Sequence, residues 1–134
     1  MNRKEQIIKT LIPLFDDYKR EMIPANEKSL QIFRQQLEER AIPNSTIEQL
    51  IGFYEVTDGV PCLDGLTIYN CDDETIFEWW DSNNVLWIGG HDDDVFRWAN
   101  NKFCIGDASD ISYDKENEFQ TFIELLTKDF ERKL

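Results

Sequence analysis

The sequence lacks several patterns on which common functions depend. It has one histidine, His91, and three widely spaced cysteines, which predict neither a multi-histidine zinc site nor a disulfide framework. No apolar run approaches the roughly 18 residues of a membrane-spanning helix, and the N-terminus does not resemble a signal peptide. Glycine-rich phosphate-binding motifs and a G-x-S-x-G nucleophile motif are also missing. We therefore expect a reduced, cytoplasmic protein with no cofactor, no metal and no membrane contact.

Positive charge is absent from the middle of the chain. Residues 41–96 contain no Lys or Arg and twelve Asp or Glu, and the 134 residues together have a formal net charge of −13. Such a field repels nucleic acid and accelerates the encounter with a basic protein. An acidic surface also aids solubility, so composition alone leaves both explanations open.

Apolar residues at helical spacing predict two helices near the N-terminus. The first covers about residues 7–22, and Pro13 should introduce a kink or divide it into two pieces because proline lacks a backbone donor. The second should begin at Asn26, a favourable N-cap, and end before Pro43.

Two more helices follow further along the chain. Ser45 and Glu48 form the pattern of a capping box, which predicts a helix over about residues 46–57, and Gly59 suits a left-handed stop. At the C-terminus, Asn117 is a possible N-cap for a helix with an apolar face.

Short β-type runs occupy the region between these helices. They cover residues 66–69, 85–88, 95–98, 102–105 and 111–113, with a possible short helix at 75–80. Asn100 and Asn101 predict a tight hairpin because asparagine tolerates a positive φ. The short connections favour antiparallel pairing, and the whole chain, residues 1–134, is expected to form a single α+β domain.

The segment Gly89–Asp94 contains His91 and three carboxylates, which are possible metal ligands. Three consecutive carboxylates do not match the alternating pattern of a calcium loop, so a polar turn between two strands is the favoured interpretation. Carboxylates are too abundant here to single out an acid–base pair, and one histidine would have to serve any nucleophile. The sequence therefore does not predict an enzyme.

The segment Cys71–Asn84 places two adjacent tryptophans among acidic residues. Trp79 and Trp80 cannot both face one core, so at least one indole should lie near the surface, where an aromatic side chain among acids suits a basic partner. Alternatively, one tryptophan belongs to the core and the other covers the sheet edge. The predicted partner-binding residues are Asp72, Asp73, Glu74, Glu78, Trp79, Trp80, Asp81, Asp92, Asp93 and Asp94.

The order of these features resembles the SUKH superfamily, the fold group of the fungal Smi and Knr regulators and of many bacterial immunity proteins. The resemblance lies in IPNSTIEQLIGFYEVTDGV, with Pro43, Phe53, Tyr54, Asp58 and Gly59 at the signature positions, followed by WIGGHDDDVFRW and EFQTFIELL. One departure is Asp58-Gly59, where the family commonly has Asn-Gly.

The resemblance implies an α+β fold with a bent antiparallel sheet of about five to six strands, flanked by N-terminal helices and a C-terminal helix. It also implies an immunity protein that binds and neutralises a toxin domain, often a nuclease. A basic toxin domain agrees with the charge argument. The alternative is a non-enzymatic regulatory module like the fungal relatives.

Overall fold

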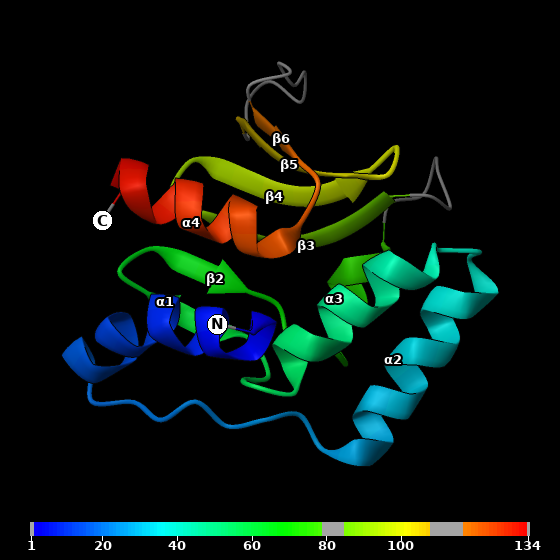
Figure 1. The fold of residues 1–134 in the computed structure, drawn as a ribbon, viewed down its shortest axis with the longest axis horizontal. Helices are drawn as coiled ribbons and strands as arrows, with labels where there is room; N and C mark the ends of the chain where they lie inside the picture. Colours follow the sequence, from blue (N-terminus) through cyan, green and yellow to red (C-terminus); the bar gives the residue numbers. More distant parts are fainter. Residues whose placement is uncertain (1, 79–84, 108–116, 134) are drawn as a thin grey trace.

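The structure is a computed structural model that describes residues 2–78, 85–107 and 117–133. The described helices are α1 (Arg3–Asp17), α2 (Glu27–Glu39), α3 (Asn44–Tyr54), the short 3₁₀ helix η1 (Glu74–Phe77) and α4 (Phe122–Lys133), and the strands are β1 (Val60–Leu63), β2 (Leu66–Ile68), β3 (Val85–His91), β4 (Asp94–Ala99), β5 (Lys102–Asp107) and β6 (Glu118–Phe119) (Figure 1). Of the helices in these ranges, none has both the length and the apolar character needed to span a bilayer.

The strands form one sheet in the order β1-β2-β3-β4-β5-β6, and every neighbouring pair is antiparallel. This meander confirms the predicted α+β class. The β4–β5 hairpin is also confirmed: Asn100 and Asn101 have φ values of 53° and 64°, as a two-residue turn with left-handed central residues requires.

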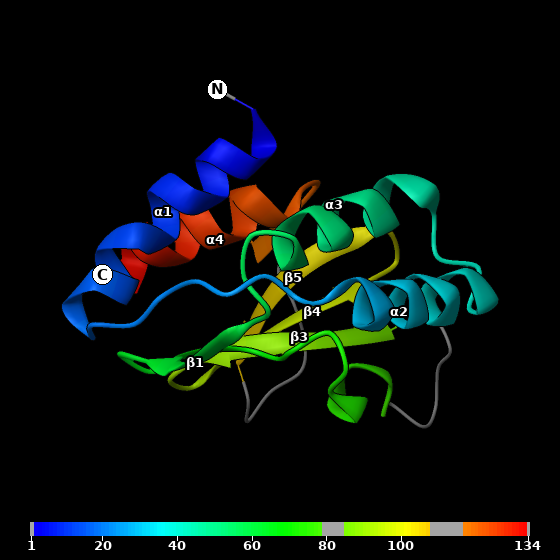
Figure 2. The same ribbon diagram turned by 90° about the horizontal axis from the view of Figure 1, so that it is seen from below.

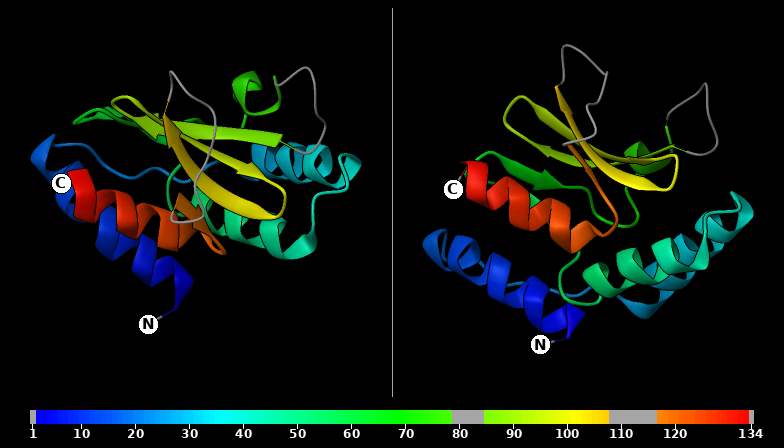
Figure 3. Two further views of the ribbon diagram at one scale, coloured as in Figure 1. Left: turned by 90° about the horizontal axis from the view of Figure 1, so that it is seen from above. Right: turned by 45° about the horizontal axis from the view of Figure 1, so that its top comes forward.

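The helices are distributed unequally over the two faces of the sheet. Figures 2 and 3 show α1, α3 and α4 together on one face, whereas η1 lies on the opposite side. Strand alternation explains the two faces, because Leu86 and Ile88 of β3 and Phe96 of β4 are buried toward the helices, while the residues between them are more exposed.

A chain of aromatic rings joins α2, α3, α4 and β5 within the core. The Tyr54 ring lies edge-on to those of Phe33 and Phe53, with centroids 5.2 Å apart in both pairs. Phe122 then contacts Phe53 at 5.1 Å and Phe103 at 5.6 Å. Edge-on and offset pairs of this kind stabilise beyond the area that they bury. The Tyr54 hydroxyl donates a hydrogen bond to the carbonyl oxygen of Tyr69 at 2.6 Å, which connects this core to the end of β2.

The first helix differs from its prediction both at Pro13 and at its C-terminal end. It continues without a break through Pro13, which is exposed, and it ends at Asp17 rather than near residue 22. The proline provides no donor for the carbonyl oxygen of Lys9 one turn earlier, and because Lys9 is exposed, water can reach that oxygen. Lys19 has a φ of 53° just after the helix, a left-handed conformation that prevents further helical turns. The predicted cap of α2 is confirmed, since the Asn26 side chain accepts a hydrogen bond from the Ser29 amide at 2.8 Å.

The predicted capping box of α3 is wrong. The helix begins at Asn44 with Pro43 as its N-cap and has no side-chain cap, so Ser45 already lies within the first turn. Glu48 instead pairs with Arg34 of α2 at 2.8 Å. Gly59 has the predicted positive φ, 89°, although the helix ends earlier, at Tyr54.

The C-terminal prediction also requires correction. Residues 118–119 pair with β5 as strand β6, and α4 begins only at Phe122, where Thr121 accepts a hydrogen bond from the Glu124 amide at 3.2 Å. Strand β1 was not predicted either. The predicted strand at 111–113 lies outside the described residues.

Candidate functional site

The face of the sheet opposite α1, α3 and α4 has its own row of side chains. Thr67 of β2 pairs with Gly90 of β3, which in turn pairs with Val95 of β4. These positions alternate with buried core residues, so they face away from the three helices. Trp87 precedes Gly90 on β3 and lies on the same face.

This row contains a hollow of about 550 Å³, called here the sheet-face pocket. It is lined by Gly65, Thr67, Tyr69, Trp87, Gly89, Gly90, Asp92, Asp94 and Val95. Tyr69 and Trp87 provide aromatic walls, and both are half-buried. Gly90 contributes no side chain between Thr67 and Val95, which leaves the centre of the row hollow.

Local backbone features of β3 shape the pocket. The strand has a bulge between Trp87 and Gly89, which shifts the register with β4. A Cβ atom at Gly89 would collide with the carbonyl oxygen of Thr67 and lie 2.9 Å from the Cα of Ile68. Glycine at this position therefore allows β2 to approach β3 closely.

The charged lining residues of the pocket are both acidic. Asp92 lies in the β3–β4 turn with a φ of 55°, and its side chain is exposed beside Gly65. Asp94 is half-buried at the start of β4, and its carboxylate lies 3.7 Å from the guanidinium of Arg132 in α4. Asp92 is therefore the more accessible carboxylate of the two.

The acidic segment before β3 acts on the same pocket. The pKa of the Tyr69 hydroxyl is raised first by its partial burial and then by the negative charges of Asp73 and Glu78. Those two carboxylates flank η1, which packs against β3. Neither Asp92 nor Asp94 contributes to this shift, so the two acidic stretches meet the pocket at different lining residues.

The predicted partner-binding residues are distributed as follows. Asp72, Glu74 and Glu78 are exposed around η1, Asp73 caps η1 by accepting a hydrogen bond from the Thr75 amide at 2.9 Å, Asp92 and Asp93 form the exposed turn, and Asp94 begins β4. Trp79, Trp80 and Asp81 lie outside the described residues.

Sequence reasoning missed the two aromatic side chains that line the pocket. Trp87 stands between Leu86 and Ile88 in a predicted strand, so alternation alone places it on the face opposite those two core residues. Tyr69 follows directly after β2, where the chain bends and alternation gives no indication.

No similar protein is found: comparisons with protein-family models, with curated proteins and with solved structures each return no match. The resemblance to the SUKH superfamily thus stays a prediction.

The interpretation of Gly89–Asp94 as a polar turn is wrong for most of that segment. Gly89, Gly90 and His91 belong to β3, and only two residues form the turn. His91 is 1% exposed, with Nδ1 2.6 Å from Oδ2 of Asp129 in α4 and Nε2 3.0 Å from the carbonyl oxygen of Asp64. Nε2 can donate to the carbonyl oxygen of Asp64, and Nδ1 contacts the carboxyl group of Asp129, so both ring nitrogens have a partner inside the protein. Within the described ranges, no group of three or more His, Cys, Asp or Glu is placed to hold a metal ion.

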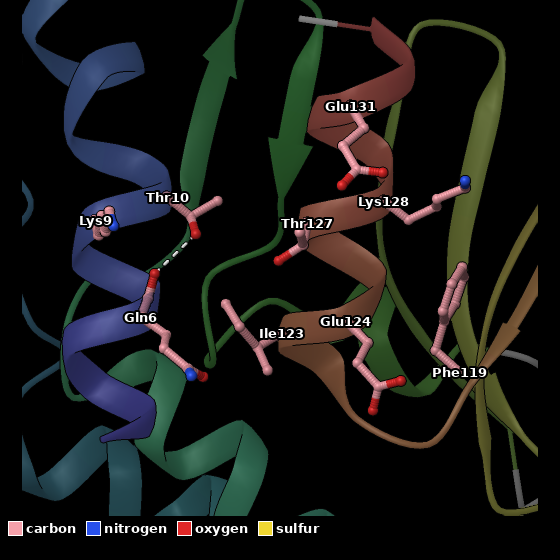
Figure 4. Close-up of a pocket in the computed structure, with 9 residues that line it drawn as sticks. All are labelled: Gln6, Lys9, Thr10, Phe119, Ile123, Glu124, Thr127, Lys128 and Glu131. Atoms are coloured by element: carbon pink, nitrogen blue, oxygen red, sulfur yellow. Dashed lines mark hydrogen bonds between the residues drawn. The ribbon is translucent and has the colours of Figure 1, made fainter. Parts of the chain in front are cut away.

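A second hollow of about 560 Å³ lies between α1 and α4 (Figure 4). Its charged lining residues are Lys9 and Lys128 against Glu124 and Glu131, so their formal charges cancel. The Thr10 hydroxyl donates to the carbonyl oxygen of Gln6 within α1 at 2.8 Å rather than into the hollow. This groove has no set of convergent charges, which distinguishes it from the sheet-face pocket.

Proposed function

We propose that this protein is a non-enzymatic binding module of the cytoplasm that neutralises a basic toxin domain by forming a stoichiometric complex with it. The observation that carries the proposal is the convergence of two acidic stretches on one aromatic pocket. Asp92 reaches the pocket from the β3–β4 turn, and Asp73 and Glu78 act on its Tyr69 wall from η1. The toxin identity of the partner comes from the resemblance to bacterial SUKH immunity proteins.

The charge distribution supports a basic partner. All twelve carboxylates of residues 41–96 lie in a segment without a single Lys or Arg. A nuclease domain is basic where it contacts its substrate, and an acidic protein occludes such a surface through complementary potentials. The same field would repel the nucleic acid itself, which favours a protein partner over direct nucleic-acid binding.

Binding is also favoured over catalysis by the position of the most obvious acid–base pair. His91 and Asp129 are 1% and 0% exposed, and both ring nitrogens of the histidine already contact oxygen atoms. A general base must reach the proton that it removes from a substrate, and this pair is enclosed by the core. Its position fits a structural contact between α4 and β3.

Growth rescue tests the proposal directly. A candidate basic toxin domain, chosen from the genes that neighbour the one for this protein, is expressed in a bacterial host with and without the protein, and the complex is then titrated by calorimetry. We expect restored growth and a one-to-one complex. The variant Asp92→Lys should weaken the complex, whereas Glu21→Lys, an equal charge change in the exposed connection between α1 and α2, should have little effect.

Two results would contradict parts of the proposal. Substrate turnover by the protein alone would contradict a non-enzymatic role. A complex with a basic cellular protein, without growth rescue, would instead favour the alternative of an intracellular regulatory module. The association rate supplies a further check, since it should fall as salt shortens the Debye length from about 30 Å at 0.01 M to about 10 Å at 0.1 M.

A further inference from the structure

The sheet-face pocket has a size and a lining that suit a side chain rather than a flat protein surface. Its volume of about 550 Å³ lies within the range of roughly 300–1,000 Å³ found for ligand pockets. Five of its nine lining residues come from β2 and β3 or the turn between β1 and β2, so paired strands support most of the cavity. Such a site keeps its shape before a partner arrives, which lowers the entropic cost of binding.

The aromatic walls favour a cation over a neutral group. A guanidinium or ammonium group within about 6 Å of an indole or phenol ring is attracted by the ring quadrupole. The protein already contains one such contact, since the guanidinium carbon of Arg97 lies 5.7 Å from the ring centroid of Trp87. The Trp87 indole therefore lies near a guanidinium on this face of the sheet, and a second cation would approach the ring with Arg97 already beside it.

Apart from Arg97 beside Trp87, the charged groups at the pocket are carboxylates, which favour a cationic ligand over an anionic one. None of the nine lining residues is Lys or Arg, and the two charged ones are Asp92 and Asp94, although the Asp94 carboxylate turns toward α4. Asp94 shares its charge with Arg132, so the exposed Asp92 is the carboxylate that an incoming cation meets. Asp73 and Glu78 add negative potential on the Tyr69 side.

Between the two basic side chains, arginine fits this lining better than lysine. The planar guanidinium stacks on an aromatic face and donates a fork of hydrogen bonds to a carboxylate, whereas ammonium is compact and more strongly hydrated. Aromatic walls beside one accessible carboxylate offer both contacts at once. A row of surface carboxylates without the walls would make no such distinction.

We propose that the sheet-face pocket receives one arginine side chain of the basic protein partner, with the guanidinium between Trp87 and Tyr69 and paired to Asp92. This proposal rests on the proposed function, because it supplies the contact through which the partner is recognised. The surrounding acidic residues then raise the association rate, while the contacts in the pocket lower the dissociation rate.

Nuclear magnetic resonance tests the pocket with small probes. The full ¹⁵N-labelled protein is titrated with the blocked tripeptide acetyl-Gly-Arg-Gly-amide, with its lysine analogue and with its citrulline analogue, which keeps the shape of arginine but lacks the charge. We expect saturable shifts at the Trp87 indole N–H and at the Gly90 and Val95 amides with arginine. Lysine should bind more weakly, and citrulline should leave these signals unchanged.

Matched variants separate a specific site from general attraction. Asp92→Asn should weaken arginine binding about threefold to fivefold, as expected for one exposed ion pair, and Glu21→Gln, with the same loss of charge, should not. Trp87→Phe should also weaken binding, because phenylalanine attracts a cation less strongly than tryptophan. The amide spectrum of each variant shows whether it is folded.

Equal binding of the citrulline peptide would overturn the proposal, as would equal weakening by Asp92→Asn and Glu21→Gln or shifts spread evenly over all acidic segments. These outcomes differ from failure of the proposed function. If the protein rescues growth but the arginine peptide does not bind the pocket, the proposed immunity function stands and only the arginine site is refuted. Arginine binding at Trp87 without rescue would support the pocket and refute the toxin partner.

Discussion

The buried contact between His91 and Asp129 allows a quantitative test of the structure. The Nδ1 atom of His91 lies 2.6 Å from Oδ2 of Asp129, and the two side chains are 1% and 0% exposed. Asp129→Ala removes the carboxylate and leaves one histidine nitrogen buried without that acceptor. Breaking a buried pair from one side costs about 3–5 kcal/mol, because the remaining polar group has lost its hydration as well as its partner.

A loss of this size is large for a domain of 134 residues. Domains are stable by only about 5–15 kcal/mol. With an unfolding entropy of about 2.1 cal/mol/K per residue, a loss of about 4 kcal/mol lowers the Tm by about 14 °C. Calorimetry measures the Tm, and urea titration measures the free energy of unfolding. Glu131→Ala, on the exposed side of the same helix, should change the free energy by less than about 0.5 kcal/mol.

A double variant separates pairing from packing. His91→Phe combined with Asp129→Leu replaces both polar groups by apolar ones, and such exchanges are often neutral or stabilising. The carbonyl oxygen of Asp64 loses its contact with Nε2, but Asp64 is exposed and water can replace it. The double variant should therefore be more stable than Asp129→Ala. The reasoning would be refuted if Asp129→Ala cost less than about 1 kcal/mol, or if the double variant were the less stable of the two.

Three further predictions concern other parts of the fold. Burial raises the pKa of Cys71 to about 12 from its ordinary value of 9.0, so a thiol reagent at pH 8 should modify the exposed Cys62 rapidly and Cys71 only after unfolding. The buried, protonated Cys71 thiol contributes to stability below pH 9, where the folded and the unfolded protein both keep it protonated. This contribution should be lost as the pH rises toward 12, and urea titrations at several pH values would measure the loss. Asn101→Val should destabilise the β4–β5 hairpin by about 1–2 kcal/mol, because a branched side chain disfavours the left-handed φ of 64°, and Asn101→Gly should not, as thermal melts of both would show. Glu78→Gln should lower the raised pKa of Tyr69 in an ultraviolet titration, and an unchanged pKa would contradict the link between η1 and the pocket.

Features of the fold that depend on a few neighbouring residues were predictable from the sequence. The turn at Asn100 and Asn101 requires two positive φ angles, and asparagine is among the residues that tolerate them. The cap at Asn26 is equally local, since its side chain bonds an amide three residues later. Periodicity identified the four main helices and the central strands because each buries one face.

Features that depend on distant partners were not predictable. Ser45 and Glu48 have the right spacing for a capping box, yet Glu48 pairs with Arg34 of another helix. The two residues of β6 form a strand only because β5 supplies their hydrogen-bond partners. His91 looked like part of a polar turn, and its burial depends on Asp129, which lies 38 residues further along the chain.

The candidate site shows the same division. The acidic residues are visible in composition, but composition does not show that η1 and the β3–β4 turn act on one pocket. Their arrangement follows from the meander, in which η1 packs against β3 and β3 ends at the turn of Asp92. The bulge after Trp87 is also invisible in the sequence, although the two glycines that follow it indicate close backbone approach.

Net charge and the sheet-face pocket should contribute to different steps of binding. The net charge of −13 acts over a Debye length, so any single neutralised carboxylate, whether Asp92 or Glu21, should lower the association rate by a similar small factor. Contacts inside the pocket form only after docking, so their loss appears in the dissociation rate. If an arginine occupies the pocket, Asp92→Asn accelerates dissociation and Glu21→Gln does not. Equal dissociation rates would mean that the acidic surface attracts the partner without this pocket holding it.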